Sequence, residues 1–158
     1  MLLDGKIVHW NIDIPGIWVG PYTLATVGSY VSSFCASSPG VYRLIALDDN
    51  GDAVTLERMC DRDRTGTLYI GKEGKTFSDR SRLSKLIRSL RPPRHGGVYN
   101  DEHKAGYRLR RHPILSQRFP ESKLAVAWCY SDDPPKAEST LLDAYFASFG
   151  DLPPLNRR

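Results

Sequence analysis

Apolar side chains recur along this chain with two different periods, which separate the expected strands from the expected helices. Residues 40–47 (GVYRLIAL), 67–71 (TLYIG) and 124–130 (LAVAWCY) are short runs rich in β-branched and aromatic residues, typical of buried strands. The first two predict a hairpin. Its connection, residues 48–66, is long and charged, and the stretch VTLERM within it is a candidate for one more strand.

Three other segments have the helical period. Residues 79–91 carry apolar residues on one face and stop at two prolines, and a helix is expected near 101–111, ending at His112-Pro113. The last helix is expected to begin near Asp133, where Asp suits the N-cap and the following proline suits the first helical position, and to end at Gly150.

The length of 158 residues and the 41% hydrophobic share fit one domain with a sizeable core. Strands and helices in this order predict an α/β domain of the α+β type, with a small, mainly antiparallel, three-stranded central sheet flanked by helices. We divide the chain into an N-terminal extension, residues 1–38, and a domain at 39–158. The aromatic residues of the extension indicate that it covers one side of the sheet.

Composition limits the expected localisation of the protein and the chemistry of its cysteines. No stretch approaches the roughly 20 apolar residues of a membrane span, and the N-terminus lacks the layout of a signal peptide, so we expect a cytoplasmic protein without membrane contact. The three cysteines share no CxxC spacing, which indicates packing residues rather than a disulfide framework or zinc site.

The net charge of +4 hides a polarised chain. Residues 72–118 hold 13 Lys and Arg against 4 Asp and Glu, a net charge of +9 that leaves −5 for the remainder. Such a concentration of positive charge favours a polyanionic partner, although a solvated basic face has the same composition.

One acidic residue stands out in the last predicted helix. Glu138 lies three and four residues before Leu141 and Leu142, so it points with the apolar stripe. An ionised carboxylate on such a face is costly unless it is paired, protonated or bound to a cation. The position therefore calls for a metal ion or an arginine.

The motifs GVY at 40–42, LYIGK at 68–72, RLSKLIRSL from Arg82, Glu138 in a late helix and PPLN ending at Asn156 follow one another in a recognisable order. Over about residues 39–156 this order resembles the GIY-YIG nuclease family, and most closely the nuclease module of the bacterial nucleotide-excision incision enzyme. The resemblance implies a GIY-YIG-like fold and endonuclease activity, but it does not identify the substrate.

The resemblance also implies roles for basic and aromatic residues. Tyr42 and Tyr69 match the two motif tyrosines, which would orient the attacking water or act as its base. Arg82 matches the arginine that holds the scissile phosphate, and Arg80 competes for this role because the loop after the second motif is a few residues longer than in the family. Lys72 would lower the pKa of a phenol or contact the phosphate, unless it is an ordinary surface lysine.

The remaining implied residues concern the metal ion and the frame of the site. Glu138 would be the only protein ligand of Mg²⁺ (or Mn²⁺), because Mg²⁺ accepts one carboxylate together with phosphate oxygens and water. An ion pair with an arginine is the alternative. Asn156, Gly40 and Gly71 would support the site, with Gly71 allowing a positive φ or a close approach of the loop to substrate.

The chain departs from the family at Leu86, where many members carry His or Tyr one helical turn after the catalytic arginine. His103 and Tyr107 are the nearest replacements, because some members have a histidine in a comparable loop, and His112 is a weaker one. For nucleic-acid contacts we expect five basic residues of the middle segment: Lys72, Arg80, Lys104, Arg108 and Arg111.

These observations predict a Mg²⁺-dependent endonuclease that hydrolyses DNA phosphodiesters by a one-metal mechanism. Two alternatives stay open: a nucleic-acid-binding module that has lost turnover, and an RNA-cleaving enzyme, since phosphate chemistry does not select the sugar. With one site per chain, cutting both strands would be simplest for a homodimer or for sequential nicking.

Overall fold

The computed structural model describes residues 18–27, 39–74, 81–92 and 102–157. Its centre is a four-stranded sheet in which all neighbouring strands are antiparallel, in the order β1-β6-β2-β5. The strands are β1 (Trp18–Thr23), β2 (Gly40–Ala46), β5 (Thr67–Glu73) and β6 (Leu124–Tyr130). The mainly antiparallel α+β architecture predicted from the sequence is therefore confirmed.

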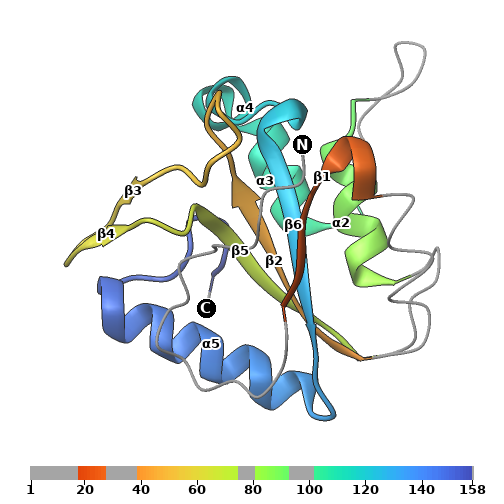
Figure 1. Cartoon of the computed structure of the whole chain (residues 1–158), viewed down its shortest axis with the longest axis vertical. Coiled ribbons are helices and arrows are strands. Elements are labelled where there is room, and N and C mark those ends of the chain that lie inside the picture. The colour runs from red at the N-terminus through yellow and green to blue at the C-terminus, as the bar shows by residue number, and fades with distance from the viewer. Residues whose placement is uncertain (1–17, 28–38, 75–80, 93–101, 158) are drawn as a thin grey trace.

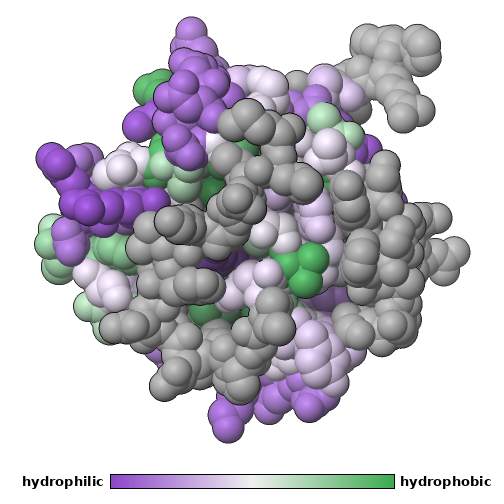
Figure 2. Space-filling model, viewed as in Figure 1, coloured by the Kyte–Doolittle hydropathy of each residue, from purple (hydrophilic) through white to green (hydrophobic). Residues whose placement is uncertain are grey.

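The predicted hairpin is the pair β2–β5, joined by a small ribbon of β3 (Leu56–Glu57) and β4 (Arg62–Asp63). β6 coincides with the run LAVAWCY and lies on the other side of β2, where every residue of the strand is buried except Tyr130. Figure 2 shows hydrophilic side chains gathered over the β3–β4 ribbon and over α4 (Pro113–Arg118).

The sheet has one strand more than the three expected. β1 pairs with β6, and residues 24–27, one helical turn after it, bring Leu24 and Val27 into the core. These residues fall in the segment described above as an extension. Short strands were conceivable in this segment, but the pattern did not locate β1 or assign it to the central sheet. Gly20 and Pro21 interrupt the strand, and its pairing register with β6 shifts between Val19 and Tyr22.

Helices cover both faces of the sheet (Figure 1). The helices α2 (Arg82–Leu90) and α3 (Lys104–Arg111) pack on the face that carries Tyr42 and Leu44. α5 (Pro134–Phe149) packs on the opposite face against Val41 and Ile70. The helix α4 and the 3₁₀ turn Glu121–Lys123 connect α3 with β6.

Local sequence explains where the helices begin and end. The Ser81 hydroxyl accepts a hydrogen bond from the Ser84 amide and starts α2, and the Asp133 carboxylate accepts one from Lys136 and starts α5. Gly150, with φ of 78°, ends α5 as expected. α4 was not predicted. It begins directly after α3 because the side chain of His112 caps it and Pro113 occupies its first turn.

Among the described residues, no helix is long and apolar enough to cross a membrane.

Candidate active site

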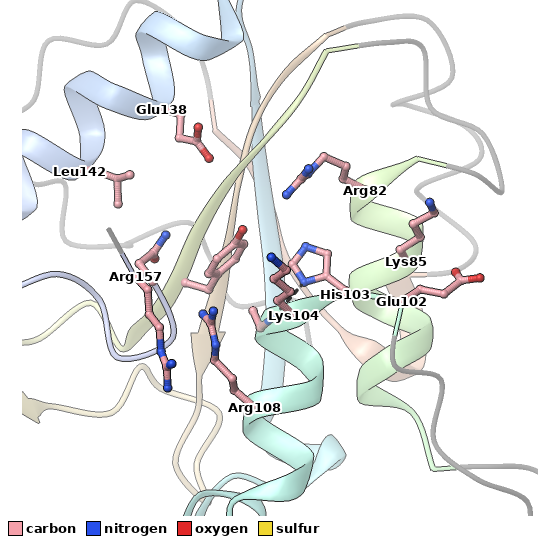
Figure 3. A pocket seen from close by; sticks show the side chains of 12 residues that line it. Arg82, Lys85, Glu102, His103, Lys104, Arg108, Glu138, Leu142 and Arg157 are labelled. Atoms are coloured by element: carbon pink, nitrogen blue, oxygen red, sulfur yellow. Dashed lines mark hydrogen bonds between the residues drawn. The ribbon is translucent and has the colours of Figure 1, made fainter.

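A cleft of about 630 Å³ opens beside β5, between α2, α3, α5 and the C-terminal segment. Figure 3 shows Arg82 projecting from α2, His103 and Lys104 from the start of α3, and Glu138 from α5 on the other side. The cleft is lined by Tyr69, Arg82, Lys85, Glu102, His103, Lys104, Ala105, Arg108, Glu138, Leu142, Asn156 and Arg157.

The two motif tyrosines lie side by side on the sheet face that points to α2 and α3. Tyr42 pairs in register with Gly71, and Leu44 pairs with Tyr69, so both phenols leave the sheet on the same face. Their ring centroids are 6.1 Å apart. Tyr42 is 1% exposed, whereas Tyr69 is half-buried and lines the cleft, so Tyr69 is the phenol that a bound molecule would meet.

Gly71 makes room for this pair of rings. A Cβ atom at Gly71 would lie 2.7 Å from Cζ and Oη of Tyr42 and 2.7 Å from Cε1 of Tyr69. The expected positive φ is absent, because φ at Gly71 lies outside the left-handed range. Gly40 has a related role at the other motif, since a Cβ there would lie 2.1 Å from the carbonyl oxygen of Cys129 on the neighbouring strand.

Burial raises the pKa of both tyrosines. For Tyr42 the shift is large, with burial as the main cause and the charge of Tyr69 as the second. For Tyr69 burial is again the main cause, while the charge and hydrogen bonding of Arg82 act in the opposite direction. Both phenols are therefore neutral at physiological pH, which makes them hydrogen-bonding groups rather than ready bases.

His103 lies in the same cluster, where the His or Tyr that is missing at Leu86 would be expected. Its Nε2 is 3.1 Å from the Tyr42 hydroxyl, and its ring stands edge-on to Tyr69 with the centroids 5.4 Å apart. The sequence places it there because His103 is the N-cap of α3, with Nδ1 accepting a hydrogen bond of 3.2 Å from the Ala105 amide. α3 in turn packs closely on α2, where Gly106 faces Ser89.

These two hydrogen bonds assign the tautomer of His103. Burial, followed by the charges of Arg82 and Arg108, lowers its pKa to about 4, so the ring is neutral near pH 7. Because Nδ1 accepts from Ala105, the ring proton is on Nε2, which donates to the oxygen of Tyr42. The other two candidates lie elsewhere: Tyr107 is 44% exposed on the outer side of α3, and His112 caps α4.

Arg82 is the first residue of α2, and its backbone amide donates to the Glu73 carboxylate at the end of β5. The guanidinium interacts with both phenols by charge and hydrogen bonding. Figure 3 shows Arg82 projecting from α2 into the cleft. Arg80, the competing arginine, lies outside the described residues.

Glu138 is positioned on the inner face of α5 beside Leu142, with its side chain 20% exposed. Its Oε2 lies 2.8 Å from Nζ of Lys72, whose side chain is 40% exposed. An ion pair with an arginine, Arg82 or Arg80, was the expected alternative to a metal ion. The cationic partner that the structure gives Glu138 is Lys72 instead. Alternation along β5 turns Lys72 toward the α5 face, away from the tyrosine pair.

Asn156 holds the wall of the cleft together. Its side-chain Oδ1 accepts a hydrogen bond of 2.9 Å from the Ile70 amide, and its Nδ2 donates one of 2.8 Å to the Ile70 carbonyl. The neighbouring Leu155 amide donates to the carbonyl of Leu68. The C-terminal segment is thus attached to β5 immediately beside Tyr69, which agrees with a supporting role.

The predicted contact residues of α3 fall into two groups. Lys104 and Arg108 line the cleft, and the Arg108 guanidinium also donates to the carbonyl of Leu155 at 2.7 Å. Arg111 lies outside it, with its guanidinium 5.3 Å from the ring centroid of Tyr107. Sequence reasoning missed Lys85 and Arg157. The signal for Lys85 was its position one helical turn after Arg82.

The carboxylates of this cleft are the groups that could hold a divalent cation. Among the described residues there is no group of three or more His, Cys, Asp and Glu side chains that could hold a metal ion. The cleft lining has two separate carboxylates, Glu102 and Glu138. Glu138 lines the cleft and already has a cationic group against one oxygen. A lone carboxylate suits Mg²⁺, which completes its coordination with water and phosphate oxygens.

We compared the chain with protein-family models, with curated proteins and with solved structures. None of the three comparisons gave a match. Evidence for the function of this chain therefore comes from the residues of the cleft and from the order of the motifs.

Proposed function

We propose that this protein is a Mg²⁺-dependent (or Mn²⁺-dependent) endonuclease of the GIY-YIG type that hydrolyses phosphodiester bonds in DNA. One observation carries the proposal. Tyr69, Arg82, His103 and Glu138 come from four separate segments of the chain and line the same cleft, with Tyr42 directly behind them. Neither core packing nor solubility requires a phenol, a guanidinium, an imidazole and a carboxylate to share one cleft.

The charge of the cleft suits a phosphodiester. Five Lys and Arg side chains and two Glu side chains line it, a net charge of +3. Arg82 offers two nitrogen donors in a fork that matches two phosphate oxygens, and charge gathers on these oxygens as water attacks the phosphorus. Lys104 and Arg108 are placed to hold the adjoining backbone.

Because both phenols are neutral, they can orient the attacking water molecule but do not act as its base. Tyr69 is positioned to orient the attacking water with its hydroxyl, while the proton of that water passes to solvent. Tyr42 is buried, and its oxygen accepts a hydrogen bond from His103 Nε2–H, so its own hydroxyl proton remains available to a neighbouring acceptor. His103 thus acts as a positioning residue for the tyrosine pair.

Glu138 is the residue that would hold the metal ion. The ion, when bound, would supply Lewis-acid stabilisation of negative charge on the phosphate oxygens. The other acidic residue of the cleft, Glu102, is less suited because its side chain is 48% exposed, against 20% for Glu138.

Cleavage assays test this proposal directly. Supercoiled plasmid DNA and structured RNA are incubated with the protein, with and without Mg²⁺, and nicking is followed on gels. We expect Mg²⁺-dependent nicking of DNA that Glu138→Ala abolishes, while DNA affinity stays within a few fold. Glu102→Ala is the matched control, since it removes a cleft carboxylate but not the assigned ligand. Undiminished nicking by folded Glu138→Ala protein would remove Glu138 from the mechanism.

A second function has one observation in its favour. The ion pair between Lys72 and Glu138 satisfies the carboxylate without a metal ion, as expected for a nucleic-acid-binding module that has lost turnover. Such a module would bind DNA or RNA in the assay above but cleave neither. Cleavage of RNA alone would support the third alternative, an RNA-cleaving enzyme.

A further inference from the structure

The ion pair between Lys72 and Glu138 is placed where a metal ligand would have to be free. Nζ of Lys72 lies 2.8 Å from Oε2 of Glu138, and both side chains are partly withdrawn from water, at 40% and 20% exposure. A carboxylate oxygen in contact with an ammonium group is a weaker ligand for any second cation, because the two positive charges repel each other at short range. Lys72 therefore competes directly with a divalent ion for Glu138.

The rest of the cleft disfavours a divalent ion when no anion is bound. Its lining has a net charge of +3 from five basic and two acidic side chains. Arg82 and Arg157 are part of this lining, and Arg82 projects toward the centre of the cleft (Figure 3). An entering phosphodiester would bring negative charge that offsets this repulsion and would attract the Lys72 ammonium as well.

From the contact and the charge together, we propose that Lys72 is a placeholder cation. In the free protein it occupies the metal-binding carboxylate. Binding of a nucleic-acid backbone allows its exchange for a divalent ion, so the metal ion and the nucleic acid bind cooperatively. This inference rests on the proposed function, because it assigns Glu138 to the metal ion. It adds an order of binding: the nucleic-acid backbone binds before, or together with, the divalent ion.

Mn²⁺ binding tests the inference without measuring cleavage. The free Mn²⁺ concentration is followed by electron paramagnetic resonance during titration of the protein, alone and with a duplex of phosphorothioate linkages that resists hydrolysis; the duplex alone is subtracted. Lys72→Met removes the competing charge at nearly constant volume, and we expect it to bind Mn²⁺ about tenfold more tightly than the native protein in the absence of duplex. Lys72→Arg keeps the charge and should resemble the native protein.

Two further variants show whether the effect is local. Lys85→Met removes the same charge from the α2 side of the cleft, away from Glu138 (Figure 3). Its effect should stay within about threefold, because distance and solvent screening weaken the repulsion. In a Glu138→Gln background, Lys72→Met should give no gain. The duplex should tighten Mn²⁺ binding about tenfold in the native protein and clearly less in Lys72→Met.

The outcomes separate this inference from the proposed function. Equal Mn²⁺ affinity of the native and Lys72→Met proteins, a gain that persists without Glu138, or an affinity indifferent to the duplex would each overturn the placeholder role. Such results alongside Mg²⁺-dependent cleavage would leave the nuclease proposal intact. Conversely, coupled Mn²⁺ and duplex binding without any cleavage would support the placeholder and reject the nuclease.

Discussion

The buried histidine of the cleft gives a prediction that does not depend on function. His103 is 5% exposed, and burial together with the charges of Arg82 and Arg108 lowers its pKa from the ordinary 6.5 to about 4. Between these two pH values the unfolded chain binds a proton that the folded chain does not. Stability contributed by the neutral ring is therefore complete above pH 6.5 and is lost as the pH falls toward 4.

The size of the loss follows from the shift in pKa. Relative to neutral pH, the proton taken up by unfolded His103 should lower the free energy of unfolding by about 1 kcal/mol near pH 5.5 and by about 3 kcal/mol near pH 4. Other groups titrate in the same range. Their contribution cancels when the native protein is compared with a variant that lacks only this ring.

His103→Asn is the suitable variant, because asparagine is a good N-cap and its oxygen replaces Nδ1 as acceptor for the Ala105 amide. Urea unfolding of both proteins is measured at several pH values from 7 to 4. We expect the variant to be less stable at pH 7, because Tyr42 loses a hydrogen bond, but to lose less stability on acidification. Parallel stability curves for the two proteins would refute the assignment of a depressed pKa to His103.

Three further predictions concern the packing, the arginine and the basic surface. Gly71→Ala should lower the free energy of unfolding by about 1–3 kcal/mol, measured in urea, because the new methyl group overlaps the Tyr42 ring; unchanged stability would mean that the phenols move freely. Arg82→Ala should reduce the cleavage rate at least about a hundredfold in single-turnover assays, and Arg80→Ala much less; the reverse ranking would shift the motif alignment by two residues. Finally, fluorescence anisotropy of catalytically inactive protein on duplex DNA should show affinity falling with salt at a slope of roughly −0.9 per phosphate contact. A triple variant that replaces Lys104, Arg108 and Arg111 with alanine should flatten that slope. An unchanged slope would mean that the DNA binds elsewhere on the protein.

The sequence predicted the elements of the fold well wherever pattern and local chemistry agree. β6 and α5 have the expected boundaries, because a continuous apolar run and a clear N-cap mark them. The fold of residues 18–27 was not predictable in this way. Their pairing with β6 and their burial come from tertiary contacts rather than from a regular alternation along the segment.

The candidate site was likewise predicted in part from the sequence. Motif order brought out Tyr69, Arg82 and Glu138, all of which line one cleft. The partner of Glu138 was beyond sequence reasoning, because Lys72 lies on a strand 66 positions earlier in the chain and reaches Glu138 only once α5 packs on that face of the sheet. The sequence pattern indicates that a carboxylate on an apolar helix face requires a cation, but it does not indicate which cationic side chain lies close enough to pair with it.

The attachment of Asn156 to β5 has a consequence for association between chains. β5 is an outer strand of the four-stranded sheet, and outer strands with unpaired backbone groups invite strand addition from other molecules. Here the amide and carbonyl of Ile70 and the carbonyl of Leu68 are already occupied by Asn156 and Leu155. The edge beside the cleft is thereby closed to a fifth strand from another protein molecule. The cleft itself stays open to a ligand that binds through phosphate rather than through a peptide backbone.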